Sequence, residues 1–355
     1  MRFYFAPMEG ITLYPLRNIH REIFGEGVDK YFTPFVTAAH NHHFKNREKK
    51  DVLPERNISF DDYPTQVVPQ IMAGCAEDFL WAAKEMRKLG YREVNLNLGC
   101  PAPTVVSRKK GSGLLHDTEY LDGMLKEIYS AIEDDRGSGA EERIYPDLSL
   151  KTRLGFSDDA EADRLMEIYA RYPVKELTIH ARVREDYYAG APRLDAYKRA
   201  VKIYRESGGN ADICYNGNID SKEALCMLME ELDMKTDPKD VLLESQSENE
   251  DKGKRGTSSI MIGRGLLSNP ALVRELRGGK GLLASELKTY LNKLYEGYAA
   301  YIPEDRNVIF KMLEHWAFLH VHFKDSDKSL KNIRKSRSRD EYHAAVNEMF
   351  THFDH

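Results

Sequence analysis

A cysteine set between a glycine and a proline is the residue with the clearest chemical potential in this chain. It follows residues 93–98, where apolar residues alternate with two asparagines, the pattern of a buried strand that carries amides on one face. Gly99 permits a tight turn and Pro101 fixes the chain after it, so Cys100 is presented at the carboxyl end of that strand. A free cysteine is more often a small buried hydrophobic residue than a catalyst. This stretch alone leaves both interpretations open.

Other polar side chains also follow short apolar runs. Gln70 offers an amide that can both donate and accept hydrogen bonds, and Lys151 emerges from a run that is otherwise apolar. A lysine there is costly unless an anionic or electron-rich group meets it. His180 and Arg182 follow a further run. A lone histidine is usually structural, but that interpretation is less convincing when lysine and amide side chains follow neighbouring strands.

Eight short apolar runs alternate with longer amphipathic stretches over the first 280 residues, and these elements must position the side chains above. We expect strands at residues 3–6, 30–36, 66–71, 93–97, 148–151, 176–180, 212–216 and 259–262. Eight such repeats predict an α/β fold, a closed (β/α)8 TIM barrel, whose active sites lie at the carboxyl ends of the strands. We also expect helices at 76–89 and 118–132, a loop at 133–142 and a charged surface insertion at 233–257.

The turns after the seventh and eighth predicted strands favour a phosphorylated cofactor. Loops at these positions of α/β barrels commonly bind phosphate through backbone N–H groups, and an arginine in the second turn adds a fixed positive charge. Flavin mononucleotide (FMN) is the simplest candidate, because the polar side chains of the third and fifth strands can address the edge of a flavin ring and no dinucleotide Gly-x-Gly-x-x-Gly unit is present. The residues of the two turns are Asn216, Gly217, Asn218, Gly263 and Arg264.

The pattern changes after the glycines of residues 278–281. Strand-like runs stop, and residues 282–350 carry apolar side chains at helical spacing, for example Leu287, Leu291 and Leu294. We therefore predict an FMN-binding catalytic barrel at residues 1–280 and a small all-helical domain at residues 281–355.

Composition limits the partners and the compartment. The chain has 355 residues, 41% of them hydrophobic, and a net charge of −5, which argues weakly against nucleic acid as a partner. Two basic runs, residues 40–50 and 324–339, could override that sum, although such runs are more often solvated faces. The four cysteines form no Cys-x-x-Cys pair, so we predict no metal site and no disulfide framework. Because the sequence has no long apolar segment, we expect no membrane partner. The scattered cysteines fit a reducing cytoplasm, and we expect the protein to be a cytoplasmic monomer.

The chain resembles the dihydrouridine synthases, flavin enzymes that reduce uridine in folded RNA. The resemblance covers nearly all of residues 1–275 and rests on seven motifs in the family's order and spacing. Two positions depart from the common pattern: Leu13, and Thr104, which stands where many members have a lysine. The matching residues are 6–10, Gln70, 95–101 with 113–115, 151–153, 180–184 with Tyr188 and Gly190, 216–219, and 261–265 with Asn269 and Pro270.

This resemblance implies reduction of the C5–C6 double bond of specific uridines, most simply in tRNA, with FMN as cofactor and NADPH or NADH as reductant. Cys100 would be the catalytic general acid. Asn97, Arg182 and Tyr188 would bind the substrate, and the helical domain would help to hold the RNA. The implied FMN-binding residues are Pro7, Met8, Gln70, Lys151, His180, Asn216, Gly217, Asn218, Gly263 and Arg264.

Three alternatives remain at this point. A small-molecule flavin oxidoreductase of the dihydroorotate or dihydropyrimidine dehydrogenase type would share the barrel and the flavin, but it leaves the basic helical part unexplained. The same reaction on ribosomal RNA is a second alternative. An RNA-binding relative that has lost activity is a third, and it predicts damage to the site, which the sequence does not contain: Cys100, Lys151, His180 and Arg264 are all present.

Overall fold

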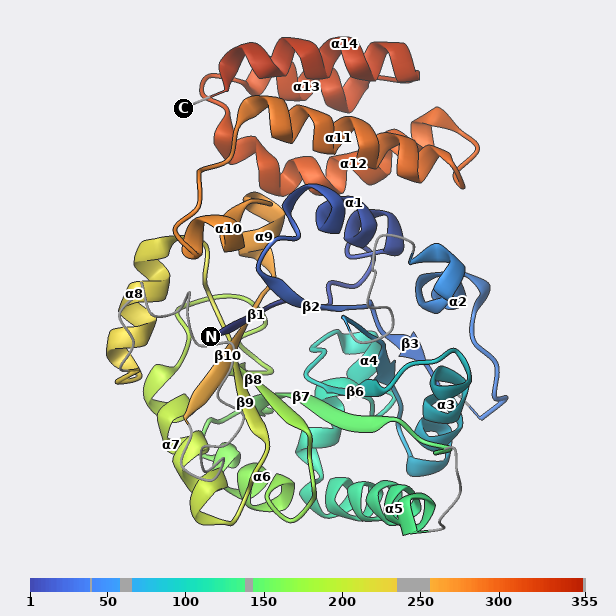
Figure 1. The fold of residues 1–355 in the computed structure, drawn as a ribbon, viewed down its shortest axis with the longest axis vertical. Coiled ribbons are helices and arrows are strands. Elements are labelled where there is room, and N and C mark those ends of the chain that lie inside the picture. The colour runs from blue at the N-terminus through green and yellow to red at the C-terminus, as the bar shows by residue number, and fades with distance from the viewer. Residues whose placement is uncertain (39, 58–65, 138–142, 235–255, 354–355) are drawn as a thin grey trace.

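A parallel sheet rolled into a barrel lies at the centre of the molecule (Figure 1). The computed structural model describes residues 1–38, 40–57, 66–137, 143–234 and 256–353. The strands of these residues form one sheet in the order β3-β5-β6-β7-β8-β9-β10-β1-β2-β4. The strands are β1 (Arg2–Phe5), β2 (Val28–Phe32), β3 (Val36–Thr37), β4 (Val67–Val68), β5 (Gln70–Met72), β6 (Glu93–Leu98), β7 (Asp147–Gly155), β8 (Glu176–Val183), β9 (Asp212–Asn216) and β10 (Thr257–Ile262).

Two prolines explain why ten strands occupy eight positions. The strand β4 pairs with β2, while β5, separated from β4 only by Pro69, pairs with β6, so the two ends of the sheet are joined and the barrel closes. Proline has no N–H to donate to a strand ladder and therefore interrupts the strand. Pro34 lies likewise in the gap between β2 and β3. The predicted (β/α)8 barrel is confirmed, with its second and third strands each divided in two.

Helices surround the sheet, and further helices follow it (Figure 1). The barrel helices are α1 (Tyr14–Phe24), α2 (Asn46–Val52), α3 (Ala76–Lys88), α4 (Pro103–Val106), α5 (Thr118–Gly137), α6 (Glu161–Tyr169), α7 (Leu194–Glu206), α8 (Lys222–Glu231), α9 (Arg264–Ser268) and α10 (Leu272–Leu276). The later helices are α11 (Ala284–Ala299), α12 (Asp305–Leu319), α13 (Asp327–Lys335) and α14 (Arg339–Met349). Short 3₁₀ turns are η1 (Pro54–Arg56), η2 (Gly111–His116), η5 (His320–His322) and η6 (Phe350–His352).

The end of α5 corrects one expectation. We predicted a loop at residues 133–142, but residues 133–137 belong to the helix, and residues 138–142 lie outside the described part of the chain. The polar last turn is helical because the buried carboxylate of Asp135 accepts hydrogen bonds from the backbone N–H groups of Ile144 and Tyr145, at 2.9–3.0 Å. Of the predicted insertion at 233–257, residues 235–255 also lie outside the described part.

Two apolar layers stabilise the barrel. A large cluster fills the space between the sheet and the surrounding helices and continues into the C-terminal helices. A small cluster fills the inside of the barrel, as expected for a barrel of eight strands, whose interior is just wide enough for side chains. The members of this inner cluster are Tyr4, Ala6, Phe32, Val68, Cys214 and Met261.

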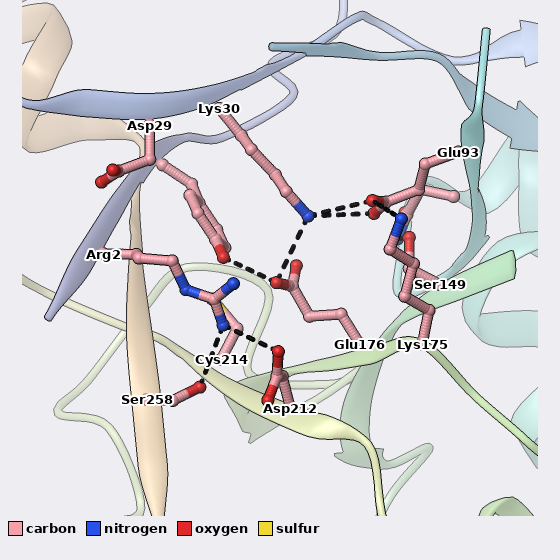
Figure 2. Close-up of polar contacts among 12 residues, drawn as sticks. Arg2, Asp29, Lys30, Glu93, Ser149, Lys175, Glu176, Asp212, Cys214 and Ser258 are labelled. Atoms are coloured by element: carbon pink, nitrogen blue, oxygen red, sulfur yellow. Dashed lines mark hydrogen bonds and ion pairs between the residues drawn. The ribbon is translucent and has the colours of Figure 1, made fainter. Parts of the chain in front are cut away.

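A buried ion cluster closes the barrel below that inner layer, at the amino ends of the strands. Lys30 points between two carboxylates, with its Nζ 3.0 Å from Glu93 Oε2 and 3.5 Å from Glu176 Oε2 (Figure 2). The hydroxyl of Tyr4 donates to the same oxygen of Glu176 at 2.7 Å. Because these charges are removed from water, each depends on its partners for solvation. The ion cluster therefore determines whether this end of the barrel can close.

Replacing Lys30 with methionine should destabilise the fold by about 3–5 kcal/mol, because it leaves the carboxylates of Glu93 and Glu176 close together in the interior without the shared cation. Urea unfolding at pH 7 measures the change. Lys202→Met is the matched control, since Lys202 lies on the surface, where it pairs with Glu206 at 3.8 Å, and we expect no shift of the unfolding midpoint. An unchanged midpoint for Lys30→Met would contradict this account.

The C-terminal helices form two layers on one side of the barrel. Helices α11 and α12 contact α1 and α9 of the barrel, whereas α13 and α14 pack on the far side of α12 (Figure 1). Lys311 of α12 donates to the backbone carbonyl of Gly10, which ties the layer to the loop after β1. The basic run of residues 324–339 lies on α13 and its flanks, in the outer layer. We propose that the domain boundary falls between Leu276 and Ala284, where α10 ends and α11 begins.

Helices that could cross a membrane are missing from the described residues: each is too short or too polar.

Candidate active site

A pocket opens at the carboxyl ends of the barrel strands, where the sequence predicted a site. Every predicted site residue except Arg182 lines it, and Glu9, Phe35 and Arg153 line it as well. Because successive parallel strands bring their carboxyl ends to one edge, residues distant in sequence meet there. The lining residues are Ala6, Pro7, Met8, Glu9, Phe35, Gln70, Asn97, Gly99, Cys100, Pro101, Lys151, Arg153, His180, Tyr188, Asn216, Gly217, Asn218, Gly263 and Arg264.

A chain of buried amides leads from the barrel interior to the cysteine turn. Asn95 donates to Ser149 Oγ at 3.1 Å, and its Oδ1 accepts from Gln70 Nε2 at 2.9 Å. Gln70 Oε1 in turn accepts from Asn97 Nδ2 at 2.6 Å. The alternation of β6 puts both asparagines on one face, and Gln70 on the neighbouring β5 lies beside them. Each amide thereby fixes the orientation of the next.

The last amide of the chain holds the turn that carries Cys100. Asn97 Oδ1 accepts from the backbone N–H groups of Gly99, at 3.1 Å, and Cys100, at 2.9 Å. Ser112 secures the other side, because its N–H and its hydroxyl both donate to the Cys100 carbonyl, at 3.1 and 2.8 Å. Burial raises the pKa of the Cys100 thiol, although the backbone N–H of Ala102 and the charge of Arg153 oppose that effect. The group therefore remains a thiol at neutral pH and can donate a proton.

Lys151 lies inside the pocket and is hydrogen-bonded to Asn216. Its Nζ donates to Asn216 Oδ1 at 2.8 Å, and Asn216 Nδ2 donates to the Met261 carbonyl at 2.8 Å, which fixes the amide orientation. Burial, and to a smaller extent the nearby Arg153 guanidinium, lowers the pKa of Lys151 to about 7. A lysine with this pKa can change its protonation state near neutral pH, so its charge responds to what binds beside it.

His180 is a neutral imidazole of defined tautomer. Burial lowers its pKa well below 6.5, and Lys151, Arg153, Arg182 and Arg264 act in the same direction. An arginine can only donate, so the 3.2 Å contact between Arg182 Nη1 and His180 Nε2 requires Nε2 to accept. The ring proton is then on Nδ1.

Tyr188 lies between two guanidinium groups at the mouth of the pocket. The Cζ atoms of Arg153 and Arg264 are each 5.7 Å from the centre of its ring, and the side chain is 49% exposed. Such cation–π contacts favour a fixed ring orientation. Arg264 also donates to Asn218 Oδ1 at 2.8 Å, which connects the turns after β9 and β10.

Comparison with known proteins identifies the relatives of this chain. A profile of the family "Dihydrouridine synthase (Dus)" matches residues 4–235. The chain belongs to the dihydrouridine synthase family. It is 26% identical to a tRNA-dihydrouridine(16) synthase of Neisseria meningitidis serogroup B over 78% of this chain and 71% of the relative. It is 25% identical to a "Probable tRNA-dihydrouridine synthase 2" of Bacillus subtilis over 76% and 70%.

Among solved structures, the old yellow enzyme from Trypanosoma cruzi matches 84% of this chain and 94% of its own, with a TM-score of 0.48 and 10% identity.

In this member of the dihydrouridine synthase family, two arginines have unexpected positions, one outside the pocket lining and one within it. Arg182 is absent from the pocket lining, and its guanidinium donates to the carbonyls of Ala189 and Gly190 at 3.1 and 2.5 Å. We propose that it positions His180 and the loop before Tyr188 instead of contacting substrate. Arg153, which the sequence analysis missed as a site residue, reaches the pocket and donates to the Gly99 carbonyl at 2.7 Å.

A usable signal for Arg153 was present in the sequence. Residues i and i+2 of a strand face the same side, so Lys151 already indicated that Arg153 on β7 would point into the barrel mouth.

The depressed pKa of Lys151 predicts a pH-dependent stability of the cofactor-free protein. The unfolded lysine binds its proton up to a pH of about 10.4, whereas the folded one releases it near pH 7, so the unfolded state holds more protons between these values. Stability should therefore rise with pH across this window. Lys151→Met should remove that rise, and its stability relative to wild type should be greatest below pH 7.

Urea unfolding from pH 6 to pH 10 tests this prediction, with Lys88→Met on the exposed surface of α3 as the control that should leave the pH dependence unchanged. A difference between wild type and Lys151→Met that stays constant with pH would exclude a lowered pKa.

Proposed function

We propose that this protein reduces the C5–C6 double bond of specific uridines in tRNA to 5,6-dihydrouridine, with bound FMN and with NADPH or NADH as the source of electrons. The observation that carries the proposal is a proton-bearing thiol, Cys100, fixed in a pocket whose other walls present groups suited to a flavin and its phosphate. The relatives include a tRNA-dihydrouridine(16) synthase and a protein described as a probable tRNA-dihydrouridine synthase, and these descriptions support tRNA as the substrate class.

The donor set of the pocket fits FMN. Arg264 with Asn218 and the turn glycines provides a cationic end for a phosphate, and Gln70, Lys151 and His180 provide polar groups for a ring edge. A side chain at Gly263 would come within 3.3 Å of Met8 Sδ, so the glycine keeps the space beside Met8 open. When bound and reduced, FMN would supply the hydride that C6 of uracil accepts.

The residues of the chain supply the rest of the reaction. Addition of hydride at C6 breaks the C5–C6 π bond and leaves the electron pair at C5, where a proton must be added. Cys100 would donate that proton from its thiol and would regain one from solvent before the next cycle. Arg153 and Tyr188, which lie beside the thiol, would hold the uracil ring. Protonated Lys151 would stabilise negative charge that develops in the pocket.

The size of the substrate adds a requirement. A uracil stacked within an RNA helix cannot enter a pocket at the end of a barrel, so the nucleotide must leave its stack, at a cost of a few kcal/mol. Contacts with the rest of the RNA must offset that cost. All four cysteines are free, so we propose that the protein works in a reducing cytoplasm.

The direct test is incubation of the purified protein with FMN, NADPH and an unmodified tRNA transcript, followed by mass spectrometry of the digested nucleosides. Formation of dihydrouridine is the expected result. Parallel reactions replace the tRNA with another possible substrate: uracil, orotate or an unmodified ribosomal RNA transcript. Turnover of a free pyrimidine without any dihydrouridine in RNA would instead identify a small-molecule oxidoreductase.

Arg264→Ala should lower the FMN content of the purified protein and weaken FMN binding by a factor on the order of 10, because it removes a charge-assisted contact to phosphate. Fluorescence titration of the flavin-free protein measures this affinity. Arg164→Ala, an exposed arginine of α6 paired with Glu167, is the control and should bind FMN normally. Equal affinities for both variants would remove Arg264 from the phosphate site.

Cys100→Ala should keep the fold and the FMN but lower the rate of dihydrouridine formation by a factor on the order of 10²–10⁴, the usual effect of a positioned general acid. Cys100→Ser should recover little, since a hydroxyl is a far weaker acid than a thiol. Cys75→Ala, which removes a cysteine outside the pocket, should react at the normal rate. Normal turnover by Cys100→Ala would mean that another group donates the proton.

A further inference from the structure

A second groove opens beside the active-site pocket, between α2 and the loop that follows Cys100. It shares Glu9 and Phe35 with the pocket, so the two form one continuous depression. We propose that this groove binds the RNA backbone phosphates next to the uridine that enters the pocket, with Arg108 as the principal contact. The inference rests on the proposed function and names the part of the surface that receives the substrate strand.

The charges of the groove fit a polyanion. Four cations line it, Lys45, Arg47, Arg108 and Lys110, against the two carboxylates Glu9 and Glu48, which leaves a surplus of two positive charges. The chain as a whole has a net charge of −5, so the charge of the groove has the opposite sign to that of the whole chain. A local surplus of this kind is what phosphate binding requires, because each bound phosphate releases counterions.

The two carboxylates are already engaged. Glu9 pairs with Arg47 at 2.9 Å. Glu48 accepts from the N–H and the hydroxyl of Thr37, both at 3.1 Å, and lies 3.6 Å from Lys45. The surplus therefore resides on the opposite wall of the groove.

That opposite wall consists of Arg108 and Lys110. Lys110 Nζ donates to the Ala38 carbonyl at 2.6 Å, which is a neutral partner, so its charge is not compensated. Arg108 is exposed and has no ion-pair partner among the residues that the structure describes. Because guanidinium groups bind phosphate through two parallel N–H bonds, Arg108 is the side chain best suited to a backbone phosphate.

The groove is mechanically connected to the catalytic turn. Arg108 and Lys110 follow α4 on the same loop as Cys100, and Ser112 binds the Cys100 carbonyl from the end of that loop. The bond from Lys110 to Ala38 ties this wall to the segment that leads to α2. A phosphate bound here would therefore be held at a fixed distance from the thiol, and would bring the neighbouring uridine into register.

The lining between the charges suits a nucleic acid strand. Phe35, at the junction of pocket and groove, is a partly buried aromatic ring on which a base next to the uridine could stack. A nucleotide that enters the pocket remains covalently joined to neighbours on both sides, so at least one neighbouring phosphate must lie at the pocket mouth. Free NADPH also carries phosphates, and the experiment below separates the two sources.

The test uses the holoenzyme with the double substitution Lys45→Ala/Arg108→Ala, and Lys49→Ala as the matched control. Lys49 is an exposed lysine of α2, the helix that Lys45 precedes, and it does not line the groove. With an unmodified tRNA transcript, the double variant should show a KM raised on the order of 10-fold and an unchanged kcat. The slope of log affinity against log salt should flatten by roughly 0.7–0.9 for each phosphate that the variant no longer neutralises. Lys49→Ala should change neither value, and Arg108→Lys should retain most of the affinity.

The outcomes separate this inference from the proposed function. If wild type forms dihydrouridine and the double variant has the same KM and salt slope, the groove proposal is wrong while the function stands. If the double variant instead raises only the KM for NADPH, the groove serves the reductant and the proposal is also wrong. If wild type modifies no RNA, the proposed function fails, and the groove is then tested by tRNA binding alone. A salt dependence of tRNA affinity that is flatter for the double variant than for wild type supports the groove proposal, and an equal salt dependence overturns it.

Discussion

The active site depends on one constraint, that amides buried inside a barrel must hydrogen-bond to one another. Asn95, Gln70 and Asn97 are hydrogen-bonded to one another in turn; Gln70 and Asn97 also line the pocket, and Asn97 holds the turn of Cys100. Loss of any one amide would leave its neighbour unpaired in the interior. The position of the thiol is thus set by side chains that reach from the barrel interior to the pocket, so the barrel core and the site cannot change independently of each other.

The overall fold was predictable because strand and helix patterns repeat with a fixed order, and eight repeats allow few other arrangements. Details that depend on tertiary contacts were not. The sequence shows Pro34 and Pro69, but only the closed sheet shows that each divides a strand. The polar end of α5 resembles a loop until the carboxylate of Asp135 is seen to bind the backbone of residues 144 and 145, a contact that local sequence does not reveal.

The candidate site was predictable wherever a side chain follows a strand, since strand ends meet at one edge. The two arginines show the limit of that reasoning. Arg182, near the carboxyl end of β8, suggests a substrate contact, but its guanidinium donates to backbone carbonyls of the loop after that strand. Arg153 was predictable from the alternation of β7, which places it on the same face of the strand as Lys151. The basic groove beside the pocket could not be predicted either, because α2 and the loop after Cys100 are brought together only by the fold.

The partial burial of Cys100 has a consequence for the reactivity of its sulfur. Peroxides and alkylating agents attack thiolates, and burial raises the pKa of Cys100, so little thiolate exists at neutral pH. Reduced flavins react with oxygen to give peroxide, which would form within reach of this sulfur. The burial that raises the pKa of Cys100 therefore also slows its reaction with oxidants, and a flavin enzyme that used this thiol as its proton donor would be less exposed to damage by the peroxide that it forms.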